Sequence, residues 1–391
     1  MPLGLYVSVP FCRTKCSYCN FASRVFSREV YPRYVGRVCD DICRAAQTAH
    51  EMGARFERSV NSVYFGGGSP TILDIEQLKQ LFVTISQNFE VAADAEISVE
   101  CAPGTVRPAM VETLLDCGVN RISFGVQSFV DREAASVARQ HNRAIVHEDI
   151  ASLRNAGILA INLDLIAGLP HQTLETWQFS LQEAIASAAP HISVYMLEVD
   201  DDSRLGRELI AGGTRYHAHF VPDEDLTADM YEMAGQQLSA AGVNHYEISN
   251  FAREGFESRH NLKYWTRQPY LGFGLDAHSM LLAENNSAVR FATPDSLDAY
   301  LSNAPLKRTA VSGQAALEET FFLGLRLTRG VDLQAAAAEF GEGALVSFSE
   351  AIIELVEAGL LSRQGDSVRL TARGRLLSNE VFERFITGKA C

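Results

Sequence analysis

The chain has 391 residues, and at about 150 residues per domain this length predicts two or three domains. With 47% hydrophobic and 21% charged residues it has ample apolar material for a large core, which excludes a disordered or collagen-like chain. The formal net charge is −14, from 34 basic and 48 acidic side chains. Because this field repels phosphate backbones, nucleic acid is not expected as a main partner.

No apolar run approaches the ~20 residues that a membrane-spanning helix needs. The first residues, MPLGLYVSVPFC, have neither the basic region nor the long apolar core of a secretion signal. Eight cysteines are too sparse for a disulfide scaffold in a chain of this length. We therefore expect a cytoplasmic protein with reduced thiols and no transmembrane segment.

Six short runs rich in β-branched residues recur along residues 1–200, and a helix-like stretch follows each of them. The runs are 3–9, 61–65, 95–100, 120–126, 160–166 and 191–197. Strands that alternate with helices predict parallel βαβ units, and six such units fit a partial (βα)6 barrel of the TIM type. A doubly wound open sheet stays the alternative, because the repeats do not show whether the strand order reverses.

The remaining residues divide into two further regions. Residues 201–310 are predicted to be a connector and covering region, with helix-like segments at 224–241 and 295–303. Residues 311–391 predict a separate, mostly helical domain in which a short strand pair turns at Gly365-Asp366, as in winged-helix modules. In an acidic chain we expect this domain to pack or to bind a protein rather than DNA.

Three cysteines crowd into the loop after the first predicted strand, as Cys12-x3-Cys16-x2-Cys19. Three thiolates can hold a soft metal centre at the mouth of a barrel. Structural zinc would need four ligands, and no second cysteine pair follows; the pair His217-x-His219 is too small to form a metal site alone. A 4Fe–4S cluster held by three cysteines leaves one iron open, so we favour this cluster over zinc or three unrelated thiols.

This loop, with Tyr18 before its last cysteine, resembles the signature of the radical S-adenosylmethionine (SAM) superfamily. The resemblance implies that the open iron binds SAM and that an electron from the cluster cleaves SAM to a 5′-deoxyadenosyl radical. It also implies a barrel that excludes water and oxygen, with SAM ligands at the C-terminal ends of the strands. The SAM-binding candidates are Tyr6, Tyr18, Gly67, Gly68, Ser69, Glu100, Gln127, Arg139, Asp164, Glu198 and His278.

The residue types suit these roles. The glycines of 66–68 let the backbone approach a ligand, although an ordinary turn could have the same sequence. Glu100 ends the third strand, where the resemblance places a carboxylate on the ribose hydroxyls and where a solvated charge is the alternative. A carboxylate on an inward-facing strand is costly to bury alone, so Asp164 is expected to face a ligand or Arg139.

Beyond the cysteine loop, the chain up to about residue 280 resembles the coproporphyrinogen oxidase-like subgroup, in stretches such as YFGGGSPT, NLDLIAGLPHQT and LGFGLDAHSM. Oxygen-independent coproporphyrinogen III oxidases carry a fourth cysteine two residues after the third, and an N-terminal extension. This chain has Phe21 at that place and two residues before its first strand. The heme-chaperone branch of the subgroup lacks both features and is the better match.

That branch carries an H-N-x-x-Y-W segment, here at 260–265, so His260, Asn261, Tyr264 and Trp265 are the heme-binding candidates. Imidazole can ligate heme iron, and aromatic rings supply a flat apolar wall. The sequence thus predicts a heme chaperone with a 4Fe–4S cluster, SAM and heme that delivers heme to an acceptor, such as a membrane-associated respiratory enzyme. Decarboxylation of coproporphyrinogen III and radical C-methylation are the alternatives, and turnover of a porphyrin is left open.

Overall fold

The computed structural model describes residues 1–285 and 287–386. All six predicted strands are present, as β1 (Leu3–Val9), β2 (Ser59–Gly67), β3 (Glu90–Cys101), β4 (Arg121–Gln127), β5 (Ala160–Ala167) and β6 (His191–Met196). They are parallel and lie side by side in chain order. The partial barrel is therefore confirmed, and the doubly wound sheet is excluded because the order never reverses.

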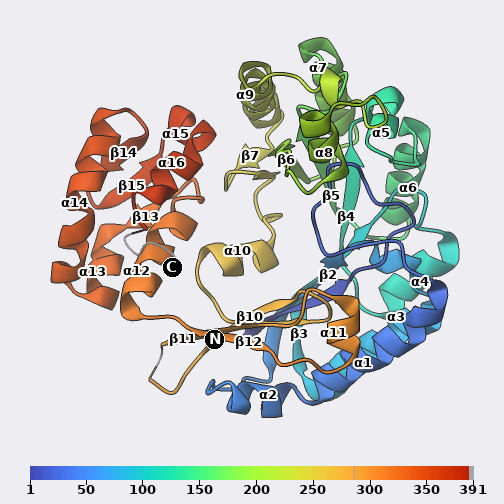
Figure 1. The fold of residues 1–391 in the computed structure, drawn as a ribbon, viewed down its shortest axis with the longest axis horizontal. Coiled ribbons are helices and arrows are strands. Elements are labelled where there is room, and N and C mark those ends of the chain that lie inside the picture. Colours follow the sequence, from blue (N-terminus) through green and yellow to red (C-terminus); the bar gives the residue numbers. More distant parts are fainter. Residues whose placement is uncertain (286, 387–391) are drawn as a thin grey trace.

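Helices cover the outer face of these strands (Figure 1). They are α1 (Tyr31–Cys43), α2 (Ala45–Glu51), α3 (Ile75–Asn88), α4 (Pro108–Asp116), α5 (Asp131–Ser136), α6 (Arg143–Asn155) and α7 (Leu174–Ala186). Alternate strand residues such as Leu5, Val7 and Phe65 are buried in the core beneath them, as the two-residue period of a strand requires. Within the described residues, no helix is long and apolar enough to cross a membrane.

Residues 201–310, predicted to be a connector and covering region, also enlarge the barrel sheet, because their strands continue it at both edges. Beyond β6 the sheet is extended by β8 (Asn250–Ala252) and then β7 (Asn244–His245). Two helices precede these strands in the chain, α8 (Arg204–Ala211) and α9 (Glu224–Ala240), and α10 (Arg259–Trp265) follows them. At the other edge stand β9 (Tyr270–Phe273), β10 (His278–Leu282), β11 (Ala288–Ala292) and β12 (Lys307–Ala310), with α11 (Leu297–Leu301) before β12. Since β9 pairs in parallel with β1, the first strand is not an open edge.

The C-terminal body, orange to red in Figure 1, stands beside the barrel. It contains α12 (Gly313–Gly324), β13 (Val331–Asp332), α13 (Leu333–Phe340), α14 (Glu342–Glu357), β14 (Leu361–Gln364), β15 (Ser367–Leu370), α15 (Ala372–Leu376) and α16 (Ser378–Glu383). The predicted hairpin forms with Gly365 at a φ of 61°, and Phe321, Phe348 and Phe385 fill a separate core. Residues 387–391, the end of the predicted domain, lie outside the described residues.

Ion pairs join the two bodies. Arg326 on the C-terminal side lies 3.6 Å from the Glu247 carboxylate and 4.3 Å above the Trp265 ring. Arg267 donates to the Thr320 hydroxyl and to the Glu339 carboxylate, at 2.7 and 3.0 Å. Because Trp265 ends α10, these contacts tie the C-terminal body to the segment that carries the predicted heme motif.

Candidate cofactor site at the mouth of the barrel

The inner face of the barrel is polar. Side chains two residues apart on a strand share a face, so Tyr6 and Ser8 of β1 point inward together. The register pairs Tyr6 with Tyr64, and Glu100 with Ser123, on neighbouring strands. A ring of hydroxyl, carboxylate and amide groups therefore surrounds the interior near the C-terminal strand ends, where βα barrels place their active sites.

The cysteine loop is fixed against the ends of β1 and β2. Cys12 N–H donates to the Arg24 carbonyl, and Ser69 N–H donates to the Phe11 carbonyl, at 3.0 and 2.9 Å. A Cβ on Gly68 would lie 2.7 Å from the carbonyl oxygens of Val9 and Phe11. Because only glycine lets the two carbonyl groups approach this closely, Gly68, one of the SAM-binding candidates, has a packing role.

The three predicted cluster ligands Cys12, Cys16 and Cys19 are free, half-buried thiols. Burial raises the pKa of Cys12, and the charges of Cys19 and Cys16 raise it further. No group of three His, Cys, Asp or Glu side chains in residues 1–285 and 287–386 is already arranged as a metal site. The three thiols of this one loop, with Arg139 beside Cys16, nevertheless match the donor set that an anionic iron–sulfur cluster requires.

A cavity of about 170 Å³ lies beside this loop. It is lined by Tyr6 of β1, Gly67 of β2 and Glu100 of β3, three of the residues named as SAM-binding candidates from the sequence. The sequence reasoning missed several of its other lining residues; Ser8 could have been found from its two-residue spacing to Tyr6, whereas Leu275 and Asp276 come from a distant segment. The remaining walls are Pro10, Phe21, Ala22 and Ser23, which belong to the cysteine loop and its ends.

Glu100 is the acidic group of this cavity. It accepts hydrogen bonds from the Tyr64 hydroxyl at 2.8 Å and from the Gly67 N–H at 3.1 Å. Burial raises the pKa of Glu100 to about 7, and Asp164 adds to the rise while the two hydrogen bonds oppose it. A carboxylate held this way can accept hydrogen bonds from ligand hydroxyls that enter the cavity.

Gln127 and Arg139 flank the cysteine loop from the β4 side. Arg139 donates to the Cys16 sulfur at 3.5 Å and to the Gly125 carbonyl, so its guanidinium bridges the loop and the strand. Gln127 is buried with a left-handed φ of 69°, and among the described residues its Oε1 atom has no hydrogen-bond partner. Buried polar atoms are normally paired, so this oxygen is a natural contact for a ligand donor.

Asp164 belongs to a hydrogen-bonded network within the barrel. Its two oxygens accept from Ser123 at 3.2 Å and from Asn162 at 2.7 Å, and burial raises its pKa. The sequence predicts that Asp164 faces either a ligand or Arg139; the Arg139 side chain donates to Cys16 and Gly125 and acts on Asp164 as a nearby charge. Neutral donors therefore satisfy this carboxylate.

The other SAM candidates lie around the mouth. Tyr18 packs on the apolar cluster of Val137, Ile166 and Leu169. Ser69 is buried behind the glycines, Glu198 is exposed in the loop after β6, and the His278 side chain is 69% exposed, 3.9 Å from Asp276. His278 thus reaches the cavity only through its neighbour Asp276.

His260 differs from its predicted role as a heme ligand. Its side chain is 1% exposed inside the barrel, where its ring nitrogens contact the Ser62 hydroxyl at 3.0 Å and the Tyr264 hydroxyl at 2.8 Å. Burial lowers its pKa to about 3, so the ring is neutral and one nitrogen donates while the other accepts. With both nitrogens engaged, neither can ligate iron in this arrangement.

The rest of the motif has a structural role as well. Glu96 of β3 accepts from the backbone N–H groups of Arg259 and His260, which holds the start of α10 against the barrel. Asn261 N–H donates to the Ser258 hydroxyl, and Trp265 stacks under Arg326. The segment therefore joins the barrel to the C-terminal body, between which α10 lies in Figure 1.

A partial parallel barrel with a three-cysteine loop after β1, and a cavity built from the first three strand ends, has the design of a radical SAM protein. The family model of the Radical SAM superfamily matches residues 6–184, and that of the HemN C-terminal domain matches residues 311–377. Among solved structures, the radical SAM enzyme coproporphyrinogen III oxidase of Escherichia coli is similar with a TM-score of 0.84, covering 99% of this chain and 90% of its own. At 23% identity this similarity shows the shared fold.

Curated relatives are similar over nearly the whole length. The heme chaperone HemW of Bacillus subtilis is 33% identical, covering 97% of this chain and 98% of its own. The HemW protein of Lactococcus lactis is 31% identical, covering 98% of this chain and 97% of its own. That of Escherichia coli is 30% identical, covering 98% of this chain and 98% of its own. The chain belongs to the HemW family of radical SAM proteins.

The buried contacts of His260 predict a large effect on stability. We expect His260→Ala to lower the free energy of unfolding by about 2–4 kcal/mol, because it opens a cavity and leaves two buried hydroxyls unpaired. His50→Ala, at an exposed site near the end of α2, is the control and changes stability by less than about 0.5 kcal/mol. Urea unfolding measures both, and equal stability of the two variants would contradict the structural role.

The raised pKa of Glu100 predicts a pH dependence. The pKa of Glu100 is about 7 in the folded state, against an ordinary value of 4.5, so the folded state binds the carboxyl proton more tightly than the unfolded chain does. The stability that this proton contributes is therefore lost as the pH rises from about 4.5 to about 7. Glu100→Gln removes the titration, and we expect it to gain stability relative to wild type from about pH 5 to about pH 8. Urea unfolding across this range tests this, with the exposed Glu112→Gln as control; a pH-independent difference for E100Q contradicts it.

Proposed function

We propose that this protein is a heme chaperone: it binds heme and passes it to an acceptor protein. The observation that carries the proposal is the similarity at 30–33% identity, over both the barrel and the C-terminal body, to proteins named heme chaperones. Phe21 supports it, because this exposed side chain lines the cavity at the place where the oxidase signature has a fourth cysteine. We place the protein in the cytoplasm, where the loop thiols stay reduced.

The cluster would be held by Cys12, Cys16 and Cys19, and SAM would occupy the neighbouring cavity. When bound, the two groups supply one-electron cleavage of SAM. The chain's own residues then have distinct tasks. Glu100 accepts from ligand hydroxyls, and Arg139 holds Cys16 against the β4 strand while offsetting the negative charge of the cluster.

Among the remaining SAM candidates, Tyr6 and Gly67 line the cavity, whereas Gln127 and Asp164 lie outside its lining. The Gly67 backbone, with a φ of 97°, lies open to the cavity, where the methionine end of SAM would pass close to the chain. Tyr6 forms one wall, and Gln127 offers the buried Oε1 atom. Asp164 reinforces the negative potential at Glu100, as the raised pKa of Glu100 indicates.

Loss of one loop cysteine tests the cluster assignment. After anaerobic reconstitution we expect Cys16→Ala to lose the absorbance near about 410 nm and most of its bound iron, because two thiolates cannot retain the cluster. Cys43→Ala removes an exposed thiol at the end of α1 and serves as the matched control. Iron content equal to wild type in C16A would refute the assignment.

The fate of the tetrapyrrole separates a chaperone from the enzymes that resemble it. Reconstituted protein is incubated anaerobically with SAM, a reductant and either heme or coproporphyrinogen III, and products are identified by mass spectrometry. We expect heme to be returned unchanged, with a stable Soret band on the protein, and coproporphyrinogen III to be unconverted. Loss of two carboxylates would indicate an oxidase, and added carbon would indicate a methylase; either product would overturn the proposal.

A further inference from the structure

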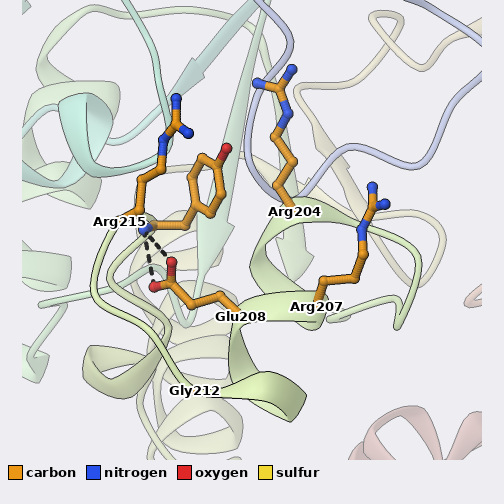
Figure 2. A pocket seen from close by; sticks show the side chains of 6 residues that line it. Arg204, Arg207, Glu208, Gly212 and Arg215 are labelled. Carbon is orange, nitrogen blue, oxygen red and sulfur yellow. Dashed lines mark hydrogen bonds between the residues drawn. The ribbon is translucent and has the colours of Figure 1, made fainter.

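A second and larger cavity, of about 450 Å³, lies outside the cofactor site. Helix α8 and the loop that follows it form its walls, with the lining residues Arg204, Arg207, Glu208, Gly212, Arg215 and Tyr216. Figure 2 shows the three arginines extending from different points of this wall, with Glu208 turned toward the loop backbone. No role in the cofactor site described above accounts for Arg207 and Arg215.

The cavity has an excess of positive charge. Its one carboxylate, Glu208, accepts from the Tyr216 N–H at 2.9 and 2.7 Å and from the Ala218 N–H at 3.2 Å, so it anchors the loop backbone. Arg215 lies 5.4 Å from the Tyr216 ring centroid, and Arg207 donates to the Ser203 carbonyl. With Glu208 engaged by the loop backbone, the arginine side chains leave this cavity with a net positive charge, which favours an anionic ligand in a chain of net charge −14.

The cavity is attached directly to the cysteine loop. Leu205 N–H donates to the Ser17 carbonyl at 2.9 Å, and Arg204 donates to the Lys15 carbonyl at 3.1 Å. A ligand in the cavity would therefore lie beside the loop that carries the cluster ligands. Helix α8 and the segment after it also carry exposed apolar side chains, since Leu209 and Ile210 are 55% and 68% exposed and Phe220 is 45% exposed.

A cationic cavity on a helix that also carries exposed apolar side chains fits an amphiphilic dianion with a large apolar body and two carboxylates. We propose that this cavity receives the propionate carboxylates of heme, with the macrocycle against the apolar side chains around α8. This inference rests on the proposed function, that the protein binds heme. It also gives heme a site that does not require the buried His260 to leave the barrel. Arginine is suited to the task because its planar group can bind a carboxylate through two parallel hydrogen bonds.

The test uses the double variant Arg207→Gln/Arg215→Gln in the full-length protein. Arg204 is left intact because it holds the cysteine loop. Spectrophotometric titration compares hemin with hemin dimethyl ester, which has the same macrocycle without charged carboxylates, in the same detergent. We expect the dissociation constant of hemin to rise by about 10-fold or more, and that of the ester to stay unchanged.

Two controls address charge and folding. Arg107→Gln/Arg329→Gln removes the same charge at exposed sites on α4's N-terminal side and in the C-terminal body, and is expected to leave the hemin affinity unchanged. Arg207→Lys/Arg215→Lys keeps the charge and is expected to retain an intermediate affinity. Reconstituted iron content and urea unfolding verify the fold, and the single variants R207Q and R215Q replace the double variant if it unfolds.

The outcomes separate this inference from the proposed function. Failure of the wild type to bind hemin would overturn the proposed function itself. Hemin binding that is equal in wild type and R207Q/R215Q would overturn only the cavity assignment, as would an equal loss of affinity for hemin and its ester. Binding of wild type and R207Q/R215Q to phosphatidylglycerol vesicles is measured as well. If the variant keeps its hemin affinity but loses vesicle binding, the cavity assignment is overturned and the arginines are assigned to lipid headgroups.

Discussion

The constraint on which the rest of the structure depends is the polar inner face of the partial barrel. Parallel strands buried beneath helices require apolar residues on one face, and here hydroxyl, amide and carboxylate groups occupy the other. Each must be satisfied in a confined space. Asn162 shows how this is achieved, because its amide donates to Ser123 and Asp164 while its carbonyl faces His191. Such a network fixes the strand register, and the register in turn aligns Glu100 with the end of β2.

The cofactor site is therefore a property of strand ends, and the cysteine loop is added to it by close backbone contact. Gly68 permits the approach of the loop to β1, and Arg139 connects Cys16 to β4. Cations and backbone N–H groups near thiolates stabilise a cluster's negative charge. Glu100 lines the cavity beside this loop, and Gln127 is buried at the end of β4.

The segment at 260–265 and the arginine cavity have complementary roles. The motif's histidine is used by the fold, since Glu96 caps α10 and Ser62 and Tyr264 engage the ring. Its tryptophan contacts Arg326, so the motif joins barrel and C-terminal body. A heme chaperone must hold its cargo and release it again, and an accessible surface with charged anchors suits this better than a closed interior site.

The six βα units and the hairpin at Gly365 could be predicted from the sequence and are present in the structure, whereas the cluster and SAM ligands named from the sequence stay predictions. The strands and the hairpin follow from local patterns, namely the two-residue period of a strand and the turn residues. The ligand predictions follow from the cysteine spacing and from the resemblance to a family. Only the tertiary structure decided that residues 201–310 extend the sheet, that Asp276 joins the pocket and that both nitrogens of His260 are occupied. Those facts depend on contacts between segments far apart in the chain, such as Ser62 with His260, and no local pattern encodes which distant partner a side chain will meet.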